Sequence, residues 1–338
     1  MLSPAPDRAS EASSGETGAI AVVVIGRNEG QRLVDCLTSL GPHAHCTVYV
    51  DSGSTDGSSG AARRMGAHVV ELDMKQPFSA ARARNAGLYE VIARWPDTDF
   101  IQFVDGDCIV HPDWIETATR FMTSRPDVAG VFGRRRERNL DHSIYNRLCD
   151  REWDGKPGTA LECGGDVFVR VNALRSVGGY RSSLIAGEEP ELCVRLRLQG
   201  WVIWRLPNEM TLHDANLTTI VQWWKRNKRA GHAFAEVASM HWNSPQGIWK
   251  RSLLRAVFWG GLLPMIVLVG AAFHPAALFL LALYPLQVAR IAGRDRFSTD
   301  GWQRGWYAML GKFAEFQGAM RWFAGRLMGR QQKIIEYK

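Results

Sequence analysis

Short β-branched runs that alternate with helical stretches constrain the fold of this chain most. Residues 20–25 (IAVVVI) form a continuous apolar run, as a strand buried on both faces requires. Further strands are predicted at residues 47–51, 68–72 and 100–104, and helical patterns separate them. Strands separated by helices pair in parallel, with helices on both faces of the sheet. The sequence therefore predicts an α/β, Rossmann-like fold with a mixed, mainly parallel sheet.

Polar residues follow three of these predicted strands. Asn28 and Glu29 come after the first, residues 51–56 (DSGSTD) after the second, and residues 105–107 (DGD) after the fourth. Crossovers in such sheets are right-handed, and ligands collect at the carboxyl ends of the strands. We therefore expect these polar residues to line one rim of the sheet.

The two carboxylates in residues 105–107 are candidate metal ligands. Asp105 and Asp107 stand at a strand end with one small residue between them. Hard oxygen ligands at this spacing suit Mg²⁺ or Mn²⁺, which can bridge a diphosphate and neutralise its charge as it leaves. An acidic turn after a strand is also common without any ion, so the motif gains weight only from its context.

That context resembles the family 2 glycosyltransferases, which have the GT-A fold. The motifs that carry the resemblance occur in family order at residues 24–29 (VIGRNE), 51–58 (DSGSTDGS), 83–88 (ARNAGL), 105–107 (DGD) and 187–196 (GEEPELCVRL). They cover roughly residues 20 to 215. Gly26 departs from the family pattern, which more often has Pro there.

The resemblance implies a site for a nucleotide-sugar donor and a divalent cation, Mg²⁺ or Mn²⁺. The residues implied for the donor are Glu29, Asp51, Ser52, Arg82, Asn85, Asp105 and Gly106, with Arg84 also near the diphosphate. The implied metal ligands are Asp107, Asp105 and His213. A guanidinium pairs well with phosphate oxygens, but Arg82 and Arg84 can equally be solvated charges on a helix, and His213 can be purely structural.

Glu188 and Glu189 are the candidate catalytic residues. A helix is predicted to start near Pro190 and to end at Gly200, so the pair lies at its N-terminus, where the helix dipole alone favours acidic residues. The functional alternative is a general base that takes a proton from an acceptor hydroxyl, with inversion of the sugar. We favour Glu189, because it occupies the motif position where the family usually has Asp. That departure leaves the assignment between the two open.

Charge and aromatic residues are unevenly distributed along the chain. Residues 201–338 hold 18 Lys and Arg against 7 Asp and Glu, a balance of +11, which leaves −4 for residues 1–200 of the overall +7. Ten of the 13 Trp also lie in this C-terminal part. A further strand is predicted at residues 201–206. A basic, aromatic helix is predicted at residues 215–242. This half is suited to an anionic surface.

Two apolar segments in the C-terminal part predict a membrane hairpin. They cover residues 253–273 and 276–289, with basic residues on both outer flanks and no Lys or Arg between them. The first is long enough to span a bilayer, and the positive-inside rule places both flanks in the cytoplasm. A re-entrant hairpin and a buried helical pair in a soluble domain remain alternatives.

A last helix is predicted from residues at helical spacing between Trp302 and Leu327. Its apolar and basic residues fit an amphipathic helix in the membrane interface, or one packed on the catalytic domain. We therefore expect a flexible tail at residues 1–18, a GT-A catalytic domain at 19–245 and a membrane-associated helical region at 246–338.

The predicted function is inverting transfer of a sugar from a nucleotide-sugar to an acceptor hydroxyl, on a lipid-linked or other cell-envelope glycan. The expected location is the inner membrane, with the catalytic domain in the cytoplasm. Two alternatives stay open: transfer to polyprenyl phosphate itself, and a catalytically silent, membrane-anchored nucleotide-binding assembly protein. Nucleic acid is not an expected partner, since the positive charge adjoins apolar segments and no RNA- or DNA-binding module is visible.

Overall fold

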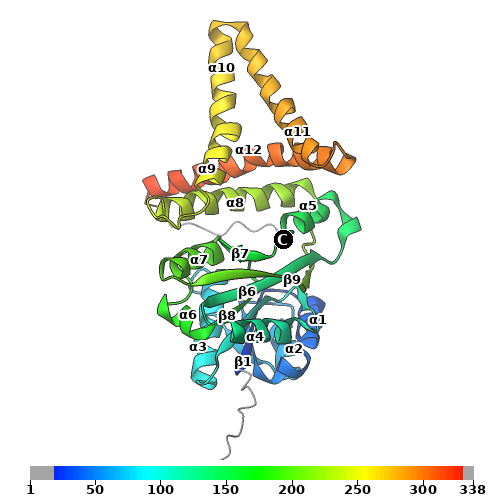
Figure 1. Ribbon diagram of the computed structural model, residues 1–338, viewed down its shortest axis with the longest axis vertical. Coiled ribbons are helices and arrows are strands. Elements are labelled where there is room, and N and C mark those ends of the chain that lie inside the picture. The colour runs from blue at the N-terminus through cyan, green and yellow to red at the C-terminus, as the bar shows by residue number, and fades with distance from the viewer. Residues whose placement is uncertain (1–18, 330–338) are drawn as a thin grey trace, which may run out of the picture.

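The computed structural model describes residues 19–329 and has two parts (Figure 1). An α/β domain holds the N-terminal part of the chain, and a layer of long helices with a projecting hairpin holds the C-terminal part. The predicted flexible tail at residues 1–18 lies outside the described residues.

One mixed sheet forms the centre of the α/β domain. Its strand order is β3-β2-β1-β4-β8-β6-β9-β5, with β7 paired to β9. The strands are β1 (Ile20–Gly26), β2 (Thr47–Asp51), β3 (His68–Glu71), β4 (Phe100–Asp105), β5 (Cys108–Val110), β6 (Val128–Glu137), β7 (Gly158–Ala160), β8 (Val167–Arg170) and β9 (Val202–His213). The first four strands in this order (β3, β2, β1 and β4) are parallel to one another. Strand β8 runs antiparallel to both β4 and β6. The predicted α/β class with a mixed sheet is confirmed, and strand β8, an antiparallel insertion after β4, makes the sheet mixed.

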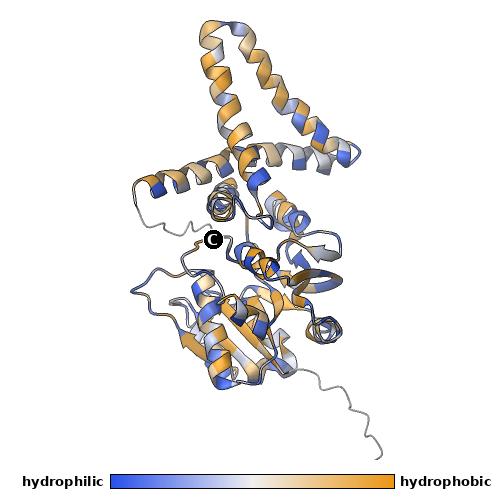
Figure 2. Cartoon of the chain, turned by 60° about the vertical axis from the view of Figure 1, so that its left-hand side comes forward, coloured by the Kyte–Doolittle hydropathy of each residue, from blue (hydrophilic) through white to orange (hydrophobic). Residues whose placement is uncertain are grey.

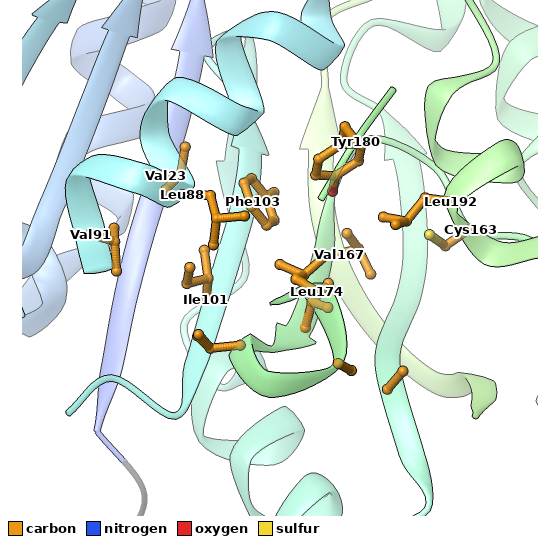
Figure 3. Packing of buried hydrophobic residues seen from close by; sticks show 14 of the residues in the cluster. Val23, Leu88, Val91, Ile101, Phe103, Cys163, Val167, Leu174, Tyr180 and Leu192 are labelled. Carbon is orange, nitrogen blue, oxygen red and sulfur yellow. The ribbon is translucent and has the colours of Figure 1, made fainter. Parts of the chain in front are cut away.

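Helices cover both faces of this sheet and bury an apolar core on each. One face packs on α3 (Ala80–Arg94), α6 (Val171–Ser176) and α7 (Glu188–Leu198). Figure 3 shows this core, to which Leu88 of α3, Phe103 of β4, Leu174 of α6 and Leu192 of α7 all belong. The other face packs on α1 (Gln31–Ser39), α2 (Ser58–Arg64) and α4 (Trp114–Ser124). The remaining helices of this domain are η1 (Gly41–Cys46), η2 (Leu140–His142) and α5 (Ile144–Glu152).

Two element boundaries differ from the sequence prediction. Helix α7 begins at Glu188 rather than near Pro190, because Gly187 adopts the left-handed conformation that opens the helix and three acidic residues fill its first turn. Strand β9 continues to His213 rather than ending at residue 206, because β6 pairs along its length and β5 pairs with its last residues. Both differences extend elements toward the predicted rim.

Two long helices, α8 (Ile220–Met240) and α12 (Thr299–Leu327), form the layer above the sheet (Figure 1). Helix α8 starts later than residue 215, because Thr219 and Gln222 form a capping box there. The helices approach so closely that a Cβ on Gly231 would overlap the backbone of Glu315, and one on Gly318 the backbone of Lys228. Small residues at the crossing therefore hold α12 against α8.

The hairpin rises from this layer on the side away from the sheet (Figure 1). Its first arm comprises α9 (Lys250–Val257), the π-helical turn η3 (Phe258–Leu262) and α10 (Leu263–Phe273), and its second arm comprises η4 (Pro275–Ala282) and α11 (Leu283–Arg294). Lys250–Phe273 and Pro275–Arg294 are long and apolar enough to cross a membrane, and few of their residues are buried. Figure 2 shows both arms as mostly hydrophobic. The predicted hairpin is therefore present.

Candidate active site

Strand pairing brings distant polar residues together at the rim of the sheet. In the β5–β9 pair, Cys108 lies opposite His213, and in the β6–β9 pair, Glu137 lies opposite the same histidine. Asp107 precedes Cys108, so its carboxylate Oδ1 lies 3.5 Å from His213 Nε2. On the other side of the ring, His213 Nδ1 lies 3.7 Å from Glu137 Oε2. The sheet register thus positions the predicted metal ligands Asp107 and His213 next to each other.

Arg84 of α3 is the centre of the candidate site. Its guanidinium nitrogens lie 2.9 Å from Asp105 Oδ1, 3.1 Å from Glu188 Oε1 and 2.6 Å from Glu189 Oε1. The Arg84 side chain is only 3% exposed, so these charged contacts are shielded from water. One cation therefore joins the predicted metal-binding motif to both predicted catalytic glutamates.

A second arginine, Arg135 of β6, binds the other side of Asp105. Its Nη2 donates to Asp105 Oδ2 at 3.0 Å, and its Nε lies 3.3 Å from Asp166 Oδ2. The buried Asp166 also accepts hydrogen bonds from the Asp105 backbone N–H at 3.0 Å and from Thr211 Oγ1 at 2.7 Å. Sequence reasoning assigned no role to Arg135, Asp166 or Glu137. The Gly164-Gly165-Asp166 run was the only visible signal for this part of the site.

Close backbone approach explains the glycine before Asp166. A Cβ on Gly165 would overlap the Arg84 guanidinium and would lie 3.0 Å from Asp105 Oδ2. A side chain at this position would therefore displace the ion pair at the centre of the site.

Burial and neighbouring charges shift the pKa values of these carboxyl groups in different directions. Burial opposes ionisation of Asp105, but the Arg84 and Arg135 guanidinium groups outweigh it and lower the pKa of Asp105. Burial dominates at Asp166 and raises its pKa. Burial, with the Glu188 charge adding to it and the Arg84 charge opposing it, raises the pKa of Glu189 to about 7. The site thus combines an ionised carboxylate, Asp105, with one whose pKa suits a base near neutral pH.

Asp107, Cys108 and His213 offer ligand atoms that all lie within 4.8 Å of one another. Carboxylate oxygen and imidazole nitrogen are both suitable ligands for Mn²⁺. Mg²⁺ binds carboxylate oxygen in preference to imidazole nitrogen. Burial strongly raises the pKa of the Cys108 thiol, which disfavours the thiolate that a metal would need. The donor set therefore fits a Mn²⁺ or Mg²⁺ ion held by Asp107 and His213, with Glu137 orienting the imidazole.

The predicted donor-binding residues after β1 and β2 lie in two adjoining loops. A Cβ on Gly106 would lie 3.3 Å from Glu29 Cγ, so these two residues are neighbours. The Ser52 backbone N–H donates to the Gly26 carbonyl at 3.0 Å. Asp51 Oδ2 accepts from the backbone N–H groups of Gly53 and Ser54 at 3.0 and 2.8 Å, and its carboxylate thus stabilises its own turn. The roles predicted for these residues in donor binding stay predictions.

Arg82 and Asn85 of α3 have contacts outside the carboxylate cluster. Arg82 donates to the backbone carbonyls of Asp73 and Gln76 at 2.8 and 3.0 Å. The buried Asn85 amide donates to the Tyr180 carbonyl at 2.7 Å, and its oxygen accepts from the Tyr180 backbone N–H at 2.8 Å. Asn85 thus fixes the segment before α7, and its predicted contact with the donor stays a prediction.

Solved structures with the same architecture identify the fold. The mannosyltransferase PcManGT from Pyrobaculum calidifontis, in complex with GDP-Man and Mn²⁺, superposes with a TM-score of 0.62 at 17% identity, over 90% of this chain and 86% of that one. S. aureus TarS 1–349 superposes with a TM-score of 0.52 at 13% identity, over 91% and 92%. The fold is the GT-A fold of glycosyltransferases, as the sequence predicted.

Sequence comparison then gives related proteins. Residues 21–175, a little less than half of the chain, match the model of Glycosyl transferase family 2. A pre-mycofactocin glycosyltransferase of Mycobacterium tuberculosis is 26% identical over 249 residues, which are 66% of this chain and 48% of the relative. The succinoglycan biosynthesis protein ExoA of Rhizobium meliloti is 24% identical over 199 residues, 55% of this chain and 59% of ExoA. The chain thus spans about half the length of the first of these relatives.

Proposed function

We propose that this protein transfers a sugar from a nucleotide-sugar donor to an acceptor hydroxyl with inversion at the anomeric carbon. The observation that supports it most directly is the Arg84 bridge, which holds Glu189 and Asp105 on the same guanidinium. The Glu189 carboxylate, whose pKa is raised to about 7, thus lies one side chain away from the Asp105 carboxylate. The named relatives are a glycosyltransferase and a succinoglycan biosynthesis protein, which agrees with this chemistry.

Glu189 is the proposed general base. Its ionised carboxylate accepts the acceptor hydroxyl proton while the acceptor oxygen forms the new bond to the anomeric carbon and the bond to the diphosphate oxygen breaks. Arg84 keeps part of the Glu189 population ionised and fixes its orientation. Asp107 and His213 are the proposed ligands of Mn²⁺ or Mg²⁺, which would neutralise the charge that develops on the leaving diphosphate.

Release of nucleoside diphosphate from a panel of nucleotide-sugars tests this function. With purified full-length protein we expect at least one donor to be turned over in the presence of Mn²⁺ or Mg²⁺. Removal of the metal by EDTA, or Asp107→Asn, is expected to lower the rate about 100-fold or more, because diphosphate departure loses its charge partner.

Asp113→Asn is the matched control for this experiment. Asp113 is exposed at the start of α4 and makes no side-chain capping bond. The Asp113→Asn variant should therefore release nucleoside diphosphate at the wild-type rate. Failure of every donor would refute the function, and a rate insensitive to both EDTA and Asp107→Asn would refute the metal site alone.

We further propose that the acceptor is a lipid-linked or other envelope glycan and that the protein sits on the inner membrane with the α/β domain in the cytoplasm. The hairpin has Lys250 and Arg251 on one flank and Arg290 and Arg294 on the other, with no Lys or Arg at its tip. An apolar stripe on α12 is exposed beside the hairpin base and consists of Trp302, Trp306, Leu310, Met320 and Leu327. The opposite face of α12 packs on α8, so the exposed stripe is free to enter the membrane interface.

Charges on the hairpin are expected to release the protein from membranes. Leu268 and Phe279 are 76% and 81% exposed on opposite arms. The double variant Leu268→Glu/Phe279→Glu raises the free energy of membrane insertion by about 2.5–3.5 kcal/mol per charge. Alkaline carbonate should therefore extract it from membranes that retain the wild type. Tyr89→Glu, at an exposed apolar position of α3, should stay with the membranes. Extraction of the wild type, or retention of the double variant, would contradict the membrane hairpin.

A further inference from the structure

We propose that Trp249 is a positioning residue for Glu189, which couples the membrane hairpin to the catalytic turn. The proposal rests on the proposed function. Trp249 is the residue immediately before α9, the first helix of the hairpin. Its backbone is left-handed, with φ 64°, a conformation that L side chains rarely adopt and that persists only where the surroundings hold it.

The Trp249 ring packs directly on the turn that presents the two glutamates. A Cβ on Gly187 would lie 2.9 Å from Trp249 Cζ3, and it would also lie 3.1 Å from Val237 and 3.3 Å from Ala233 of α8. Gly187 itself is left-handed, with φ 82°, and is followed at once by Glu188. The backbone of this turn is therefore enclosed between the indole and α8.

Burial raises the pKa of Glu162, and the neighbouring Trp249 side chain opposes that rise. Glu162 lies in the segment that leads to Gly165 and Asp166, the residues in contact with Arg84 and Asp105. Trp249 thus packs on one of the chain segments that surround the Arg84 cluster and neighbours the other.

The rest of the linker between α8 and α9 binds α7 itself. Arg197 near the end of α7 donates to Gln246 Oε1 and to the Gln246 carbonyl at 2.6 and 2.8 Å. His241 Nε2 lies 3.3 Å from the Oε1 of the buried Glu191. Trp249, His241 and Gln246 therefore hold the helix of Glu189 at its start, its first turns and its end.

This arrangement makes the position of the base depend on how the hairpin is seated. A displacement of α9 moves Trp249. Because Gly187 is enclosed between Trp249 and α8, its turn has to move as well. Misplacing a catalytic group by about 1 Å can lower a rate by as much as 10²-fold. The donor residues on β1, β2 and β4 make no part of this contact, so donor binding should be little affected.

Kinetics of the full-length protein in lipid nanodiscs test the proposal. Trp249→Ala removes the ring contact with Gly187, and we expect kcat to fall about 10-fold or more with donor KM within about twofold. Trp249→Phe keeps a smaller ring against Gly187, so its kcat should fall only about 3-fold. Melting temperatures of both variants establish that the assayed protein is folded.

Trp242→Ala is the control, because Trp242 is an exposed tryptophan of the same linker. Its kcat should equal that of the wild type. A wild-type kcat in folded Trp249→Ala, or an equal loss in Trp242→Ala, would overturn the proposal. If Trp249→Ala does not fold, Trp249→Phe decides, and an unchanged kcat there overturns it. Full activity of Glu189→Gln would instead refute the proposed base, so the two failures are distinguishable.

Discussion

Replacement of Arg84 by Met is expected to lower the melting temperature of the detergent-solubilised protein by roughly 6–20 °C at pH 8. The substitution leaves Asp105, Glu188 and Glu189 without their shared cation in a buried site. Removing one partner of a buried charge pair typically destabilises by about 3–5 kcal/mol, and each kcal/mol corresponds to about 2–4 °C for a domain of this size. Thermal unfolding followed by tryptophan fluorescence measures the shift, and sugar transfer should be lost as well.

The pH dependence of this loss has a definite sign. In the wild type the Asp105 pKa is lowered, so its contribution to stability is present above the pKa of the unfolded chain and is lost as the pH falls through the folded value. Arg84→Met removes a main cause of that shift. The melting temperatures of variant and wild type should therefore differ more at pH 8 than at pH 5, where the uncompensated carboxylates begin to protonate.

Arg82→Met is the matched control, two residues earlier on the same helix. Arg82 is partly exposed and donates to backbone carbonyls of the preceding loop, so its replacement should shift the melting temperature by only about 1–2 °C. Equal shifts in the two variants would show that the Arg84 bridge does not stabilise the fold.

The parallel part of the fold was predictable because each of its strands has its own sequence signal. Strand β1 is a continuous apolar run between turn residues, and β2 and β4 end in polar clusters, so their order and common rim follow from general rules on crossovers. Strands β5, β7 and β8 are three or four residues long and β6 is bulged. Periodicity is not visible in runs so short, and the antiparallel insertion therefore had no local signature.

The same difference separates the site residues that were predicted from those that were missed. Asp105, Asp107, Glu188 and Glu189 belong to local motifs, and the structure places all four around Arg84 or His213. Asp166 and Arg135 reach Asp105 only through the pairing of β8 and β6 next to β4. Contacts of this kind depend on tertiary pairing, and no spacing along the chain reveals them. The structure surrounds Arg84 with carboxylates, and its expected place near a diphosphate stays a prediction.

Glu189→Gln is expected to lower kcat for sugar transfer by about 10³-fold, within the 10²–10⁴-fold range typical of a general base. The amide keeps the size of the side chain and its contact with Arg84, so the variant should remain folded. Glu188→Gln removes a carboxylate that is more deeply buried, 5% exposed against 12% for Glu189, and should reduce kcat less than 10-fold. A greater loss in Glu188→Gln would transfer the role of base to Glu188.

The pH profile connects the loss of activity to one carboxyl group. A base must be ionised to act, and the pKa of Glu189 is raised to about 7, so wild-type activity should rise with pH through about 7 and then level off. The Glu189→Gln variant has no group to titrate at this position, and its residual activity should not show that rise. Since both proteins keep the same donor rim and metal ligands, a rise near pH 7 that persisted in the variant would have to come from another group. Glu189 would then orient Arg84 but not accept the proton.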